Sequence, residues 1–200
     1  MNDDGTMARM PDLVKFAQHH GLKMATIADL IAYRRRNDKI VARDMEAPFH
    51  SKWGGDWRMM VYTNTVAYAE HIALVKGDLS GDKPVMVRVH AVNVLDDVLG
   101  DQGSGKAGQL HSAMEMIAEH GSGVVVLVRE PRATSLSDRV RAQLERRPAA
   151  PELRDYGVGA QILLDLGIHE MILLSNTKRS IIGLDGYGLK VVEQRSIPVS

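Results

Sequence analysis

Hydrophobic and polar residues alternate along several short segments of the chain, as they do in strands that have one buried and one exposed face. In residues 85–90 valine occupies every second position, with Met86, Arg88 and His90 between the valines. This period of two, together with the β-branched side chains, predicts a β-strand. Residues 123–128 form a continuous apolar run, which is typical of a strand buried on both faces. The other predicted strands lie at residues 22–25, 58–63, 66–76, 171–174 and 189–194.

Other segments have apolar residues at helical spacing. Residues 109–120 place Leu110, Met114 and Ile117 on one side and end before Gly121, which predicts a helix with a glycine stop. The other predicted helices lie at residues 11–20, 26–36, 135–147 and 156–166. Strands that alternate with helices indicate an α/β (α+β) fold, with a mixed β-sheet flanked by helices.

Composition narrows the class of protein. The 44% share of hydrophobic residues is enough for a core, and the net charge of zero gives no general attraction to nucleic acid or to a membrane. No apolar run approaches the roughly 20 residues of a membrane span, and no secretory signal opens the chain. The absence of cysteine excludes disulfides and thiolate metal sites and agrees with the cytoplasm. We expect a cytoplasmic protein without nucleic-acid or membrane partners.

Residues 88–110, RVHAVNVLDDVLGDQGSGKAGQL, join a predicted strand to a predicted helix through a glycine-rich loop. Backbone N–H groups and the helix dipole converge at such a junction, so it is a candidate anion-binding site. Residues 103–108 match the spacing of a dinucleotide-binding loop, and residues 100–106 nearly match a P-loop. Ala107 stands where a P-loop has the Ser or Thr that holds Mg²⁺. A P-loop-like phosphate-binding module is one alternative.

The same stretch resembles the zinc loop of GTP cyclohydrolase II, which runs Arg-Val-His-Ser-Glu-Cys, an Asp-Val-Phe-Gly-like turn, and Cys-Asp-Cys-Gly-x-Gln-Leu. The matching residues are Arg88, Val89 and His90 at the start, Asp97, Val98 and Gly100 in the turn, and Gln109 and Leu110 at the end. Residues 71–78 and 155–176 resemble further segments of that family. The resemblance implies the family's fold, a homodimer, and a zinc enzyme of riboflavin biosynthesis that opens the guanine ring of GTP.

The chain lacks the residues that bind zinc in this family. The three positions of its zinc cysteines fall on Asn93, Ser104 and Lys106. Asparagine and serine are poor zinc ligands and a lysine ammonium repels the ion. The eight histidines show no metal-binding spacing. We therefore expect no metal site, no bound cofactor, and no zinc-activated water to attack the guanine ring.

The resemblance also implies a degenerate catalytic pair and a partial nucleotide site. Arg154 matches the family's catalytic arginine, and Glu152 stands where the family has an aspartate. The implied nucleotide-binding residues are Arg88, His90, Gln109, Glu130, Arg132 and Ser175. The segment at 136–152 is shorter than in the family, Pro131 replaces a glycine, and Ser180 replaces a lysine. Losses in separate parts of one site indicate relaxed or changed chemistry.

The start of the chain resembles a second family. Residues 2–9, NDDGTMAR, and the two elements after them resemble the end of 3,4-dihydroxy-2-butanone 4-phosphate synthase, which is fused ahead of GTP cyclohydrolase II in many bacteria. We expect a synthase fragment at residues 1–36, a linker at 37–47 and a GTP cyclohydrolase II-like domain at 48–200. The metal-binding loop and catalytic histidine of the synthase would precede Met1.

Together these observations predict a degenerate GTP cyclohydrolase II-like domain that acts as a structural or regulatory partner of a synthase domain in cis, with GTP or another nucleotide as a candidate ligand. The alternative is an active enzyme with an unrecognised site, which converts GTP to the 2,5-diamino-6-ribosylamino-pyrimidinone 5'-phosphate, formate and pyrophosphate.

Overall fold

The computed structural model describes residues 5–25, 33, 38–66, 69–81, 83–145, 153–176 and 187–198, of which residues 153–156 are described by their backbone alone. The chain divides into two compact units, Met1–Asp38 and Lys39–Ser200. Among the described residues, no helix combines the length and the apolar character needed to cross a bilayer.

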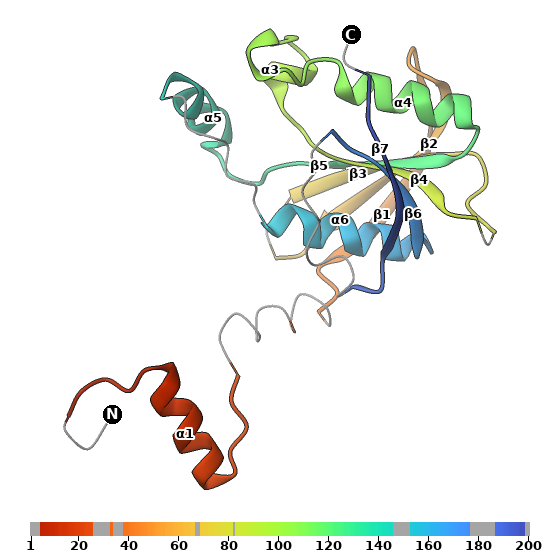
Figure 1. Ribbon diagram of the computed structural model, residues 1–200. Coiled ribbons are helices and arrows are strands. Elements are labelled where there is room, and N and C mark those ends of the chain that lie inside the picture. The colour runs from red at the N-terminus through yellow and green to blue at the C-terminus, as the bar shows by residue number, and fades with distance from the viewer. Residues whose placement is uncertain are drawn as a thin grey trace. The chain divides into compact units, whose positions relative to one another are not determined.

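The N-terminal unit contains the helix α1, Met10–His20 (Figure 1). Pro11 stands in the first turn, the backbone N–H of Arg9 donates to Asp12 at 3.0 Å, and Gly21 ends the helix with a φ of 63°. The predicted helix is therefore confirmed. The predicted strand at 22–25 is wrong, since these residues pair with no neighbouring strand. The predicted helix at 26–36 lies outside the described residues except for Tyr33.

The second unit is built on a seven-stranded sheet with the order β1-β2-β3-β5-β4-β6-β7. The strands are β1 Val41–Ser51, β2 Gly55–Asn64, β3 Ala69–Lys76, β4 Val85–Ala91, β5 Gly123–Val128, β6 Glu170–Leu174 and β7 Lys190–Arg195. The pairs β1·β2, β2·β3 and β3·β5 are antiparallel. The pairs β5·β4, β4·β6 and β6·β7 are parallel. The expected mixed sheet is confirmed.

Strand β1 occupies most of the range that was expected to be a linker. It pairs with β2 from Val41 opposite Asn64 to Ser51 opposite Gly55. Most of its side chains are exposed, and it forms an edge of the sheet. Backbone hydrogen bonds to β2 hold this segment as a strand. Such bonds do not depend on the side chains, so they impose no hydrophobic alternation on the sequence of β1. The next two strands also differ from the predicted ranges 58–63 and 66–76, since β2 spans Gly55–Asn64 and β3 begins at Ala69.

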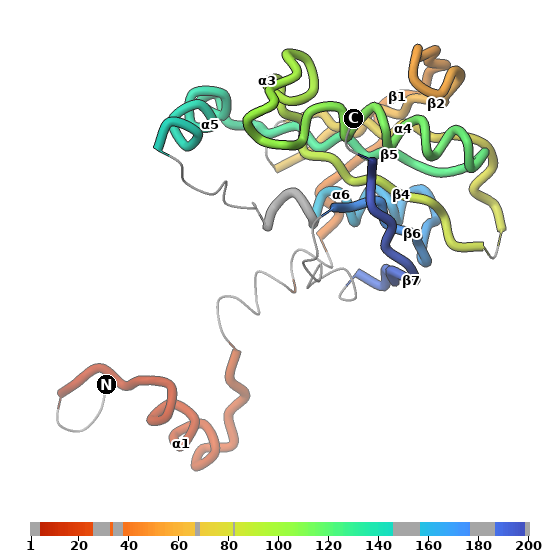
Figure 2. The backbone as a smooth tube through the Cα atoms, turned by 45° about the horizontal axis from the view of Figure 1, so that its top comes forward, coloured from red at the N-terminus to blue at the C-terminus, as the bar shows by residue number. Residues whose placement is uncertain are grey.

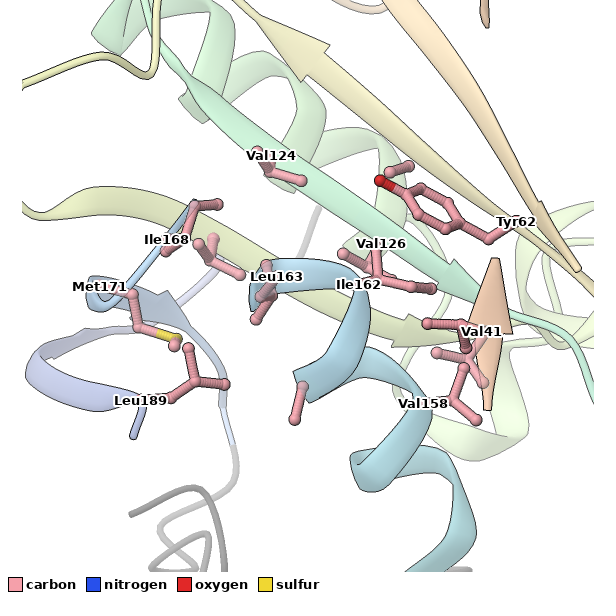
Figure 3. Packing of buried hydrophobic residues seen from close by; sticks show 14 of the residues in the cluster. Val41, Tyr62, Val124, Val126, Val158, Ile162, Leu163, Ile168, Met171 and Leu189 are labelled. Atoms are coloured by element: carbon pink, nitrogen blue, oxygen red, sulfur yellow. The ribbon is translucent and has the colours of Figure 1, made fainter. Parts of the chain in front are cut away.

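Two helices cover the sheet. Helix α4, Gln109–His120, lies on one face and α6, Leu153–Asp165, on the other (Figure 1). Val124 and Val126 of β5 pack into the cluster beside α6, whereas Val125 packs into the cluster beside α4. Figure 3 shows Val124 and Val126 together with Ile162 of α6. Strand β5 is thus buried on both faces, as its apolar run predicted.

The remaining helices lie at one edge of the sheet. They are α3 Val94–Asp97, the short 3-10 helix Gln102–Ser104, and α5 Ser135–Leu144. In both views α5 lies beside the loop that carries α3, and Gln143 Nε2 donates to Asp101 Oδ2 at 2.8 Å (Figures 1 and 2). Because β4, β5, β6 and β7 are parallel, their carboxyl ends all meet at one edge. In sheets of this kind, ligand sites form at the carboxyl ends of parallel strands.

Candidate functional site

Three predicted nucleotide-binding residues lie together at the end of β4. Arg88 and His90 are two positions apart on the strand, so their side chains leave the same face. The Arg88 guanidinium donates to the carbonyl of Leu174 at 3.0 Å, lies 3.2 Å from Nδ1 of His90, and reaches Oε1 of Gln109 at 3.5 Å. Gln109 comes from the first turn of α4. The arginine therefore connects β4, β6 and α4.

His90 is held from its other side by Asp97. Its Nε2 lies 2.9 Å from both carboxylate oxygens of Asp97, and both side chains are buried. Since Nδ1 accepts from Arg88, Nε2 carries the proton that is donated to Asp97. Burial alone raises the pKa of Asp97, but the hydrogen bonds from His90 and from the Asn93 backbone N–H outweigh it and leave this pKa lowered.

The positions of the family's zinc cysteines form a second network, around Asp96. Asn93 Nδ2 donates to one carboxylate oxygen of Asp96 at 2.6 Å, and Ser104 Oγ donates to the other at 2.7 Å. The same serine oxygen accepts from the backbone N–H of Lys106 at 3.0 Å. Asp96 is only 6% exposed, so its charge is held by these donors rather than by water. The loop is closed by hydrogen bonds between its own residues.

This donor set does not fit a zinc ion. A catalytic zinc site needs three nitrogen, thiolate or carboxylate ligands that converge on an open fourth position. Asn93 and Ser104 are already committed to Asp96, and Lys106 brings a positive charge. Among the residues that the structure describes, no group of three histidine, aspartate or glutamate side chains is arranged to hold a metal.

Glu130 and Arg132 lie at the next strand end, after β5. Glu130 forms ion pairs with Arg132 and with Arg139 of α5, the second at 3.7 Å. Glu130 and Arg139 line a cavity of about 150 Å³, whose other wall includes Asn93. Asn93 therefore contacts both the network around Asp96 and this cavity.

Ser175 directly follows β6. Its backbone N–H donates to the carbonyl of Arg195 at 2.9 Å, and its carbonyl accepts from Gln194 Nε2 at 3.0 Å. It lines a shallow hollow with Asn176, whose side chain forms two hydrogen bonds with the Ile197 backbone, at 2.9 and 2.6 Å. Ser175 is thus bonded to β7, and the carbonyl of the residue before it, Leu174, accepts from Arg88.

The predicted catalytic pair falls on side chains that the structure does not describe. Glu152 and the side chain of Arg154 lie outside the described residues, as does Ser180. In contrast, Asp96 and Asp97 were not predicted as site residues, although they hold the two networks together. A local signal was present for Asn93, which is the N-cap of α3 and accepts from the backbone N–H of Leu95 at 3.2 Å.

Comparison with known families agrees with this arrangement. Residues 42–196 match the GTP cyclohydrolase II family, and residues 1–33 match 3,4-dihydroxy-2-butanone 4-phosphate synthase. The first match includes the glycine-rich loop, which leaves the P-loop alternative without support.

Known proteins similar to this chain include the riboflavin biosynthesis proteins RibBA of Bacillus cereus and Bacillus cytotoxicus. Each is 42% identical over 207 residues, which cover 97% of this chain and 52% of the relative. A solved structure, described as RibBX, a two-domain 3,4-dihydroxy-2-butanone 4-phosphate synthase from A. baumannii, is 33% identical with a TM-score of 0.63. It is matched over 98% of this chain and 52% of its own length. The chain thus spans about half the length of these relatives, and it belongs to the GTP cyclohydrolase II family of riboflavin biosynthesis, with a synthase fragment at its start.

Proposed function

We propose that this chain contributes a cyclohydrolase-like domain that has lost zinc-dependent GTP ring opening. In this proposal it acts in the cytoplasm as a structural or regulatory partner of a 3,4-dihydroxy-2-butanone 4-phosphate synthase in cis. One observation carries the proposal. The positions of the three zinc cysteines hold Asn93, Ser104 and Lys106, and the first two are hydrogen-bonded to Asp96.

Ring opening needs a nucleophile at an unactivated carbon, and in this family zinc supplies it by lowering the pKa of bound water. A neutral amide and a hydroxyl bound to a carboxylate cannot do this. Asp96 and Asp97 are both occupied, the first by Asn93 and Ser104 and the second by His90.

The charged residues at the ends of β4 and β5 agree with the same proposal. Glu130 is paired with Arg132 and with Arg139, so its carboxylate is already engaged beside the cavity. The RibBX relative is described by its synthase activity, which agrees with a second domain whose role is not ring opening. We further propose a homodimer, as the family resemblance implies.

The first test is the metal content of the purified chain. We expect no stoichiometric zinc by elemental analysis, because no three suitable ligands converge on the loop. The matched control is the triple variant Asn93→Cys, Ser104→Cys, Lys106→Cys, which should retain about one zinc per chain. One zinc per unmodified chain that survives mild chelation would contradict the proposal.

The second test is turnover of GTP. Formate and the diaminopyrimidine product should not form above background with the unmodified chain, with or without added zinc. The triple cysteine variant should bind zinc and still show little turnover, because Glu152 and Pro131 also depart from the family pattern. Robust turnover by the unmodified chain would instead support the alternative of an active cyclohydrolase.

A further inference from the structure

Strand β1 carries a row of apolar side chains on one face. Met45, Ala47 and Phe49 form the row, and the residues between and beside them are polar, apart from one proline. Met45 lies opposite Val61 of β2, and Ala47 lies opposite Met59. Opposite residues of an antiparallel pair share a face of the sheet. Because Met59 packs against the cluster beside α4, the row lies on the face of the sheet that carries α4.

Helix α4 does not cover this row. The buried cluster beside α4 contains Trp57 of β2 but no residue of β1, a strand that the structure describes in full. Met45 is 56% exposed and Phe49 is 36% exposed, and Val61 beside Met45 is half-buried. Neither the backbone bonds to β2 nor the core of this chain requires apolar residues at these positions. Contiguous apolar side chains on a surface indicate contact with another molecule.

The free edge of β1 is poorly suited to pairing with another strand. Pro48 has no N–H to donate, and Asp44 and Glu46 place charges on the same strand. Prolines and charged side chains on an edge strand oppose edge-to-edge pairing. A partner therefore contacts the face that carries Met45 and Phe49 and does not extend the sheet.

The charges around the row are balanced within the chain. On the same face, Glu70 of β3 pairs with Arg129 at 3.8 Å, and on the opposite face Glu46 pairs with Arg58 at 3.5 Å. The net charge of the whole chain is also zero. A surface with balanced charge can face its own copy without repulsion, whereas a nucleic acid or an anionic lipid surface needs an excess of basic residues. The charge pattern therefore favours a second copy of this chain as the partner.

We propose that two copies of the chain associate through the apolar row Met45, Ala47 and Phe49, with Val61 and Met59 beside it. A twofold axis brings the same row of both copies together, so that each copy covers the exposed side chains of the other. Sheets that pack face to face bury the side chains between them in this way. The inference rests on the homodimer of the proposed function and specifies the surface that forms it.

Analytical ultracentrifugation of the full 200-residue chain tests this surface. Met45→Asp places a charge in the row and should raise the dissociation constant by about 100-fold or more, as loss of a central interface contact does. Met45→Ser removes the apolar contact without adding a charge, so it gives a second reading if Met45→Asp does not fold. Leu144→Asp is the matched control, because Leu144 is 80% exposed on α5. Figures 1 and 2 show α5 and the turn between β1 and β2 at opposite ends of this unit.

We expect dimers of the parent and of Leu144→Asp, and monomers or much weaker dimers of both Met45 variants. The parent dimer should persist in high salt, because salt screens charged contacts and not apolar ones. A folded Met45 variant that dimerises as tightly as the parent, or a parent dimer that dissociates in high salt, would overturn this surface and leave the homodimer in place. A parent that stays monomeric would overturn both, whereas the proposed loss of zinc chemistry is tested separately by metal content and turnover.

Discussion

Asp96 shows how a single carboxylate can take over the closing of a loop. It accepts from Asn93 and Ser104, two of the three positions at which the family has zinc cysteines, at 2.6 and 2.7 Å. Removal of one hydrogen-bond donor from a buried carboxylate destabilises the fold, so replacement of Asn93 or Ser104 alone should cost stability. This explains how the loop between β4 and α4 remains ordered although its side chains do not fit a zinc ion.

His71 is the residue that should give the fold a measurable dependence on pH. It is 2% exposed, and its Nδ1 accepts from the Arg129 backbone N–H at 3.1 Å. Its Nε2 has no hydrogen-bond partner among the residues that the structure describes. Burial, with a smaller contribution from the nearby charge of Arg129, lowers the pKa of His71 to about 4. The folded protein therefore keeps this imidazole neutral in conditions where an unfolded chain protonates it.

We predict that acidification from pH 6.5 towards pH 4 destabilises the protein through His71. In this range the unfolded state binds the proton, since the ordinary histidine pKa is about 6.5, and the folded state does not. Stability therefore rises with pH across this window and levels off above it. Urea unfolding at several pH values measures this slope. His71→Asn keeps an acceptor for Arg129 and should show a smaller slope, and an equal slope in both proteins would contradict the prediction.

At the scale of the elements, α6 and α5 differ in how much they bury. Ile162 and Leu163 of α6 are fully buried against the sheet (Figure 3). By contrast, α5 has no buried residue, and its apolar stripe Leu136, Val140 and Leu144 is exposed. Both sequences have helical periodicity, so the pattern alone does not distinguish a core helix from a peripheral one.

This difference predicts unequal costs for matched truncations in the two helices. Ile162→Ala should lower the free energy of unfolding by about 2–5 kcal/mol, because it leaves a cavity in the core. Leu136→Ala, at a side chain that is 50% exposed, should change it by no more than about 0.5 kcal/mol. Urea unfolding at pH 7 measures both values. Similar losses in the two variants would mean that α5 is covered in solution.

At the scale of the whole molecule, the proposed role is contact with a synthase domain and with a second copy. We predict that this chain self-associates in solution, which analytical ultracentrifugation measures. In a protein that places a complete synthase ahead of it, deletion of residues 39–200 should lower the melting temperature or the synthase turnover, because a partner that binds only the folded state stabilises it. A truncated synthase that matches the longer protein in melting temperature, oligomeric state and turnover would show that the two units are not coupled.

Local sequence patterns determined much of this fold. The alternation in β4, the apolar run of β5 and the helical spacing of α4 predicted these elements nearly to the residue, because burial of one or both faces sets the period of each. The replacement of all three zinc cysteines was also evident from the sequence, since ligand chemistry depends on residue type.

Other features were decided only by the tertiary structure. The edge strand β1 lies where the sequence predicted a linker, and β5 lies between β3 and β4 in the sheet. Arg88 bonds to the carbonyl of Leu174, and Arg43 to Asp165, across 86 and 122 positions of the chain. Strand order and such contacts depend on pairing between residues far apart in the chain, which local periodicity does not record. The sequence therefore revealed the change at the metal ligands, whereas the network around Asp96 and the contact of Arg43 with Asp165 became visible only in the folded chain.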